Sequence, residues 1–103
     1  MAVITYSKPS LDDLKAIHAY ISRDSFVNAT RFIESIREHI KTLNTYPEIG
    51  SLVFPMKFNN LRQLLHKKYR VVYHFFNETV TIITIHHQSR LVENIKGIKE
   101  YKE

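Results

Sequence analysis

Residues 61–90, LRQLLHKKYRVVYHFFNETVTIITIHHQSR, decide the fold of this chain. Val, Ile, Thr, Tyr and Phe fill three short runs, and these residue types are typical of a pleated, half-buried surface. The segment therefore predicts strands at Leu61–His66, Tyr69–Phe76 and Thr79–His87. Asn77 and Glu78 form a two-residue hairpin connection, although the glycine that such a turn prefers is missing.

Alternation along a strand predicts which side chains share a face of this sheet. On the middle strand, one face carries Arg70, Val72, His74 and Phe76, and the other carries Tyr69, Val71, Tyr73 and Phe75. On the last strand, the two sets are Val80, Ile82, Thr84 and His86 against Thr81, Ile83, Ile85 and His87. Both faces are largely apolar. One face must pack against the helices that precede the sheet. The other face is either a second small core or a surface for a partner.

Two amphipathic helices precede the sheet. Leu11, Leu14, Ile17 and Ile21 recur at spacings of three, three and four, which predicts a helix that ends near Arg23. We expect Ser10 to cap this helix, with Asp13 in the capping-box position. Ser25 is the expected cap of a second helix ending near Asn44, whose apolar stripe is Ala29, Phe32, Ile33, Ile36, Ile40 and Leu43.

The expected fold is α+β, with residues 1–103 forming a single domain. A short strand at Val3–Tyr6 comes first, and the two helices form an antiparallel hairpin because few residues join them. The three-strand antiparallel meander then packs on the helices. Residues 51–60 are an irregular connection with room for a short extended piece, and residues 91–103 are a short tail with helical spacing.

The chain is basic, with 15 Lys and Arg against 10 Asp and Glu, a net charge of +5 and a pI near 9.6. Because the excess is clustered, it indicates an acidic partner: nucleic acid, the ribosome or an acidic protein. There is no cysteine, which excludes disulfides and thiolate chemistry. The sequence has neither a signal-peptide pattern nor the roughly 18 consecutive apolar residues of a membrane span. We therefore expect a cytoplasmic protein that has no membrane partner.

An ordered set of motifs resembles the ParE/RelE superfamily of toxins from type II toxin–antitoxin systems. The motifs are S-x-x-D-L-x-x-I-x-x-Y-I from Ser10, A-x-x-F-I-x-x-I from Ala29, L-x-x-Y-P-E-I-G from Leu43, L-R at Leu61, K-Y-R-V-V-Y from Lys68 and H-x-x-R from His87. The chain departs from the family pattern at Phe26, where many relatives have a helix-starting proline, and at Ser89, where a second basic residue is frequent.

The resemblance implies a toxin but leaves its target open. RelE-like members cleave mRNA in the ribosomal A site, whereas ParE-like members inhibit DNA gyrase. The long helical hairpin and the Y-P-E-I-G turn are similar to ParE, while Arg70 and Arg90 are similar to the arginine pair around the scissile phosphate in RelE. The family also implies a cognate antitoxin that covers the apolar groove and the basic edge. A hetero-oligomer with the antitoxin and a homo-oligomer both remain open.

For RNA cleavage the candidate catalytic residues are Arg70, Arg90 and His87. Guanidinium groups match phosphate oxygens in bidentate fashion, and an imidazole moves protons near neutral pH. The further candidates for nucleic-acid or partner binding are Arg62, Lys67, Lys68, His86 and Tyr101. The lysine pair of RelE falls on Leu61 and Gln63, and its C-terminal tyrosine falls on Lys96, so Tyr101 is the expected substitute.

Simpler interpretations stand beside these assignments. Arg70 fits an ion-paired strand residue, and an inward-facing histidine at 86 or 87 fits a hydrogen-bonded core residue. The residues indicate neither a cofactor nor a metal, because adjacent strand residues point apart and no carboxylate pair or cysteine joins the two histidines. Three functions remain: a ribosome-dependent endoribonuclease, a gyrase inhibitor without catalysis, and an inactive antitoxin-binding module. We favour the endoribonuclease because its candidate catalytic residues can be identified in the sequence.

Overall fold

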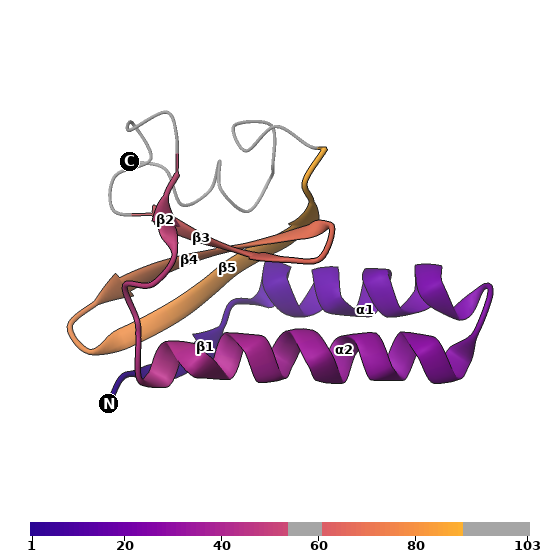
Figure 1. The fold of residues 1–103 in the computed structure, drawn as a ribbon, viewed down its shortest axis with the longest axis horizontal. Helices are drawn as coiled ribbons and strands as arrows, with labels where there is room; N and C mark the ends of the chain where they lie inside the picture. The colour runs from indigo at the N-terminus through magenta and orange to yellow at the C-terminus, as the bar shows by residue number, and fades with distance from the viewer. Residues whose placement is uncertain (54–60, 90–103) are drawn as a thin grey trace.

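The computed structural model describes residues 1–53 and 61–89. The chain runs through β1 (Val3–Tyr6), α1 (Lys8–Ser22), α2 (Phe26–Lys41), the 3-10 turn η1 (Thr42–Asn44), β2 (Ser51–Leu52), β3 (Leu61–His66), β4 (Tyr69–Phe76) and β5 (Thr79–His87). Figure 1 shows the two helices lying antiparallel beneath one face of the sheet. The predicted α+β fold is confirmed, as are the bounds of the three main strands. The short tail with helical spacing lies outside the described residues.

The five strands form one sheet in the order β1-β5-β4-β3-β2. β1 pairs in parallel with β5, from Val3 opposite Thr79 to Tyr6 opposite Ile82, and the other neighbours are antiparallel. Where β1 ends, the Ser7 backbone N–H donates to the Ile82 carbonyl at 2.9 Å. Among the described residues, no strand pairs with β5 on its β1 side beyond Ile82, and α1 begins there.

A β-bulge in β5 overturns the strict alternation expected for that strand. Val72 lies opposite Thr84, but the next residue, Tyr73, lies opposite Ile82, so Ile83 is the extra residue. Ile85 consequently joins Val80 and Ile82 in the core under the helices, although alternation put it on the other face. The predicted faces of β5 were therefore right up to Ile83 and wrong from Thr84 onward.

Each face of the sheet carries an apolar core. The larger one lies against the helices. It contains fully buried residues from both the helical hairpin and the sheet, among them Ile36, Ile40, Leu43, Tyr73 and Ile82. The smaller one is on the opposite face and consists of Val53, Leu61, Val72 and Ile83. The expectation that both faces are apolar is confirmed, and the helical hairpin covers the larger core.

The first helix begins earlier than expected. Ser7 is the N-cap, and its hydroxyl accepts a hydrogen bond from the Ser10 backbone N–H at 3.2 Å. Pro9 fits the first turn because it lacks an N–H that would need a partner there and has a helical φ. Ser10 is therefore not the cap, and Asp13 is not part of a capping box. Ser25 caps α2 as expected, accepting from the Asn28 N–H at 3.1 Å.

The two hairpin turns of this sheet adopt positive φ angles at residues other than glycine. Asn77 and Glu78 both have positive φ, 52° and 62°, as a type I′ turn requires, and Lys67 has φ 54° in the preceding turn. The one glycine in the described part of the chain, Gly50, is placed by close packing instead. Its N–H donates to the buried Tyr73 hydroxyl at 2.9 Å. None of the helices within residues 1–53 and 61–89 is long and apolar enough to span a bilayer.

Candidate functional site

The β3–β4 turn and the end of β5 meet at one end of the sheet and bring basic residues together there. Gln88 joins the two segments: its backbone N–H donates to the Lys68 carbonyl and its side-chain amide donates to the Lys67 carbonyl, each at 2.8 Å. The Arg70 guanidinium donates to the Gln88 carbonyl at 3.2 Å. Sequence reasoning missed Gln88, because its partners become neighbours only through the register of the sheet.

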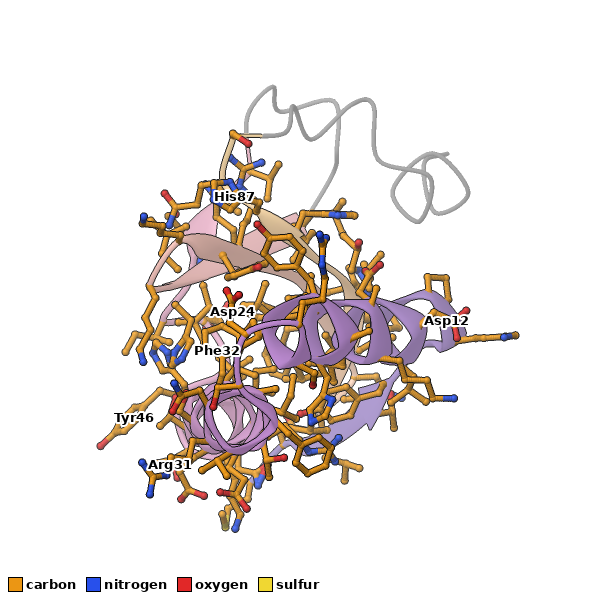
Figure 2. The ribbon with its side chains drawn as sticks, turned by 90° about the vertical axis from the view of Figure 1, so that its right-hand side faces the viewer. Asp12, Asp24, Arg31, Phe32, Tyr46 and His87 are labelled. Atoms are coloured by element: carbon orange, nitrogen blue, oxygen red, sulfur yellow. The ribbon has the colours of Figure 1, made fainter. Side chains whose placement is uncertain are left out.

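Of the two adjacent histidines, the structure brings His86 to Arg70. The two residues are direct cross-strand partners, which places their Cβ atoms about 5 Å apart on one face. His87 is the partner of Tyr69 on the opposite, helix-facing side, and the two rings lie 5.6 Å apart. Figure 2 shows His87 at the sheet end of the molecule, far from Asp12 on α1. The candidate site on the Arg70 face therefore contains His86.

His86 is tied to the first helix through Thr84. Oδ2 of Asp13 accepts hydrogen bonds from the Thr84 hydroxyl at 2.8 Å and from the Ile85 backbone N–H at 2.9 Å. The same Thr84 hydroxyl is hydrogen-bonded to Nε2 of His86. Thr84 is only 1% exposed, so these bonds form out of water. A carboxylate from α1 thus occupies the edge of β5 that β1 leaves open.

Arg62 lies apart from this cationic end. It pairs with Tyr73 near the start of β3, and its guanidinium donates to the Gly50 carbonyl at 2.7 Å and the Glu48 carbonyl at 3.1 Å. Its other terminal nitrogen lies 3.8 Å from the Glu48 carboxylate. Arg62 therefore anchors the Tyr-Pro-Glu-Ile-Gly turn against the sheet.

A histidine pair lies on the helix side of the same sheet end. Nδ1 of His39 and Nδ1 of His66 are 2.8 Å apart, and Nε2 of His66 is 3.0 Å from the Ser35 hydroxyl. Burial lowers the pKa of His66 below 6.5, and the neighbouring His39 and Lys67 lower it further. The sequence alone indicates no role in a site for His39 and His66. The pairing joins α2 to β3.

Aromatic rings continue this seam between α2 and the sheet. The Phe32 ring lies 5.6 Å from the His66 ring and 5.3 Å from the Tyr69 ring, and Figure 2 shows Phe32 between the helices and the sheet. Burial raises the pKa of the Tyr69 phenol, with a smaller contribution from Tyr20. Tyr69 consequently stays protonated near neutral pH and acts as a packing residue here.

The remaining sequence-predicted residues, Arg90 and Tyr101, lie outside the described residues, and their roles remain predictions. Within residues 1–53 and 61–89, no three His, Cys, Asp or Glu side chains gather as the ligands of a metal ion would. On the Arg70 face the described site offers a guanidinium and a hydrogen-bonded imidazole, whereas the Lys67 ammonium lies on the helix side, 5.7 Å from the centre of the Phe32 ring. Side chains of these two types suit the binding of an anionic group and the transfer of protons.

Comparison with known proteins gives the family. A family model described as the ParE toxin of the type II toxin–antitoxin system parDE matches residues 4–92. No curated protein matches the chain.

Solved structures share the fold at low sequence identity. A chain of the chromosomal ParDE system from P. aeruginosa has a TM-score of 0.68 at 20% identity, covering 84% of this chain and 96% of that one. A chain of the RelBE2 toxin–antitoxin complex from Mycobacterium tuberculosis has a TM-score of 0.62 at 18% identity, covering 84% and 96%. A chain of the YoeB–YefM complex from Staphylococcus aureus has 0.58 at 14% identity, covering 84% and 97%. With most of its length matched by the family model, the chain belongs to the ParE toxins of type II toxin–antitoxin systems, within the ParE/RelE superfamily.

Proposed function

We propose that this toxin inhibits growth by cleaving mRNA on the ribosome. The observation that supports this proposal is the cross-strand pair of Arg70 and His86. A guanidinium and an imidazole side by side are the groups that phosphodiester cleavage needs. Both the ribosome and its mRNA are cytoplasmic, and we place the activity there.

In this reaction the ribose 2′-oxygen forms a bond to the adjacent phosphorus while the bond from phosphorus to the 5′-oxygen breaks. A base takes the proton of the 2′-hydroxyl, and an acid protonates the leaving 5′-oxygen. Arg70 binds the non-bridging oxygens, where negative charge grows in the transition state. Arg90 is the proposed second arginine, and one of His86 and His87 carries protons.

The second candidate function is inhibition of DNA gyrase. The observation that favours it is the family match, because the matching model describes ParE toxins. In this case the basic end of the sheet would serve an acidic partner and no residue would be catalytic. Arg70 and His86 would then matter for charge and not for proton transfer.

We also propose that a cognate antitoxin covers the helical hairpin. Between α1 and α2 lies a groove of about 320 Å³ that is lined by Leu11, Leu14, Lys15, His18, Ile33 and Arg37. The exposed Phe26 continues this surface, since its ring lies 5.1 Å from the ring of His18. An amphipathic antitoxin segment would bury these groups, so the free toxin should melt at a lower temperature than the complex. Equal melting temperatures would contradict this assignment.

One experiment separates the two targets. The purified chain is added to a cell-free translation reaction whose mRNA ends are mapped, and a gyrase supercoiling assay runs in parallel. We expect codon-phased cuts that vanish in Arg70→Ala and Arg90→Ala. Intact mRNA together with trapped gyrase–DNA complexes would refute the nuclease proposal.

The matched control is Arg31→Ala. It removes the same charge from an exposed position on α2, and Figure 2 shows Arg31 projecting away from the sheet. Cleavage should remain at the wild-type rate in this variant. If Arg31→Ala abolishes cleavage as Arg70→Ala does, overall charge and not the site explains the loss.

A further inference from the structure

We propose that Asp13 and Thr84 are positioning residues that fix the tautomer of His86 and leave Nδ1 of that ring as the proton acceptor next to Arg70. The inference rests on the proposed function, because it names the base of the same site. It also assigns a role to a residue of α1, more than 70 positions earlier in the chain.

The donor and acceptor roles of the Thr84 hydroxyl determine the tautomer of His86. The Thr84 hydroxyl has one proton, and it donates that proton to Oδ2 of Asp13 at 2.8 Å. Towards His86 the hydroxyl oxygen can therefore act only as an acceptor, so Nε2 of His86 must carry a hydrogen. In the neutral imidazole the lone pair then belongs to Nδ1.

The arrangement is held in place by burial. Thr84 is 1% exposed and cannot turn its hydroxyl to water without disrupting the edge of β5. Asp13 is fixed independently, because the same oxygen also accepts from the Ile85 N–H at 2.9 Å. The ring of His86 is thus hydrogen-bonded to a buried hydroxyl, which in turn is bonded to a carboxylate that the backbone holds in place.

The chain of hydrogen bonds suits proton uptake. When Nδ1 accepts the proton of a 2′-hydroxyl, the ring becomes an imidazolium, and its positive charge is stabilised through Thr84 by the Asp13 carboxylate. The 2′-oxygen then forms its bond to phosphorus, and Arg70 on the neighbouring strand binds the phosphate oxygens. Asp13 and Thr84 touch neither substrate nor reacting atoms.

The test compares two substitutions at Thr84. Thr84→Val is isosteric but lacks the hydroxyl, whereas Thr84→Ser keeps it. Long-range ¹H–¹⁵N NMR of the full chain should show His86 as the Nε2–H tautomer in the wild type and in Thr84→Ser, and a mixture in Thr84→Val. Because general-base catalysis contributes about 10²–10⁴-fold, loss of the hydroxyl should slow cleavage at least about tenfold, and His86→Ala should slow it further.

A second pair of variants isolates the carboxylate charge. Asp13→Asn retains an oxygen that accepts from Thr84 and from the Ile85 N–H, so it preserves the hydrogen bonds and removes the charge. It should lower the cleavage rate and shift its pH profile. Asp12→Asn is the matched control, because the Asp12 side chain is 56% exposed on the neighbouring position and pairs with Lys8. That variant should cleave at the wild-type rate.

The outcomes separate this inference from the function on which it rests. Thr84→Val that folds and cleaves like the wild type overturns the inference, as does an Nδ1–H tautomer of His86 in the wild type. A wild-type chain that leaves mRNA intact refutes the proposed function and the base role together. The NMR result then still decides whether Asp13 and Thr84 position the ring. Urea unfolding of each variant identifies any loss of activity that comes from misfolding.

Discussion

Replacing Gly50 with alanine should destabilise the fold strongly. An added Cβ would lie 2.7 Å from the Gln63 carbonyl oxygen, 2.7 Å from the Tyr73 hydroxyl and 2.8 Å from Cε1 of Tyr73. None of these atoms can move easily, because Gln63 is paired on both sides, with Ser51 and with Val72, and Tyr73 is fully buried. The alanine also displaces the Tyr73 hydroxyl from the Gly50 N–H.

The size of the effect follows from two contributions. Overpacking of a core by one methyl costs about 1–3 kcal/mol, and the lost hydrogen bond adds about 0.5–1.5 kcal/mol. We therefore expect the free energy of unfolding to fall by about 2–4 kcal/mol, which lowers Tm by roughly 10 °C or more in a chain of this size.

Urea denaturation followed by circular dichroism measures this change. Ile49→Ala is the control, because Ile49 is 61% exposed beside Gly50 and its loss should alter stability by less than about 0.5 kcal/mol. Gly50→Ala within about 0.5 kcal/mol of the wild type would refute the packing argument. Introducing Tyr73→Phe into Gly50→Ala should recover part of the loss, since it removes one of the two 2.7 Å contacts.

Three other changes test separate parts of the structure. Glu78→Gly should raise stability by about 1 kcal/mol, because Glu78 has φ 62°, which glycine adopts without steric cost; an unchanged denaturation midpoint would count against this. Acidification should weaken the fold: the folded-state pKa of His66 lies below 6.5, so stability is full above that pH and falls as pH drops towards the folded pKa. The decline should be smaller in His66→Gln when unfolding is measured at neutral and acidic pH. Arg62→Ala should cost about 1–3 kcal/mol in the same assay, since it removes charged hydrogen bonds to the carbonyls of Glu48 and Gly50, and a neutral result would mean that the turn is held without it.

The strands were predictable from local sequence, and the faces of β5 were not. β-branched and aromatic runs with a two-residue turn define where β3, β4 and β5 begin and end. The bulge at Ile83 lies instead where Ser7 and Asp13, far away in the sequence, hydrogen-bond to β5. For that reason alternation misplaced Ile85, and the sequence could not tell which histidine lies beside Arg70.

The residue types of the candidate site were predictable from the sequence, but the hydrogen bonds that join them were not. The clustering of Lys67, Lys68 and Arg70 with two histidines is visible in the sequence and indicates an anion-binding end of the sheet. The roles of Asp13 and Gln88 were hidden, because each depends on a partner that only the sheet register or the helix position supplies. Asp13 also fits a local capping pattern in the sequence, but in the structure its carboxylate accepts hydrogen bonds from Thr84 and Ile85 of β5.

The parallel pairing of β1 with β5 has a consequence for the order of folding. The Ser7 hydroxyl bonds to the Ile83 carbonyl, 76 positions along the chain, so closing this edge needs a long loop to be ordered first. The helical hairpin and the β3–β4–β5 meander contain nearer contacts and can form earlier. We therefore expect β1 to be the last strand that joins the sheet during folding. Asp13 follows β1 closely in the sequence and bonds to β5. We therefore expect the hydrogen bonds from Asp13 through Thr84 to His86 to form only after β1 has paired with β5.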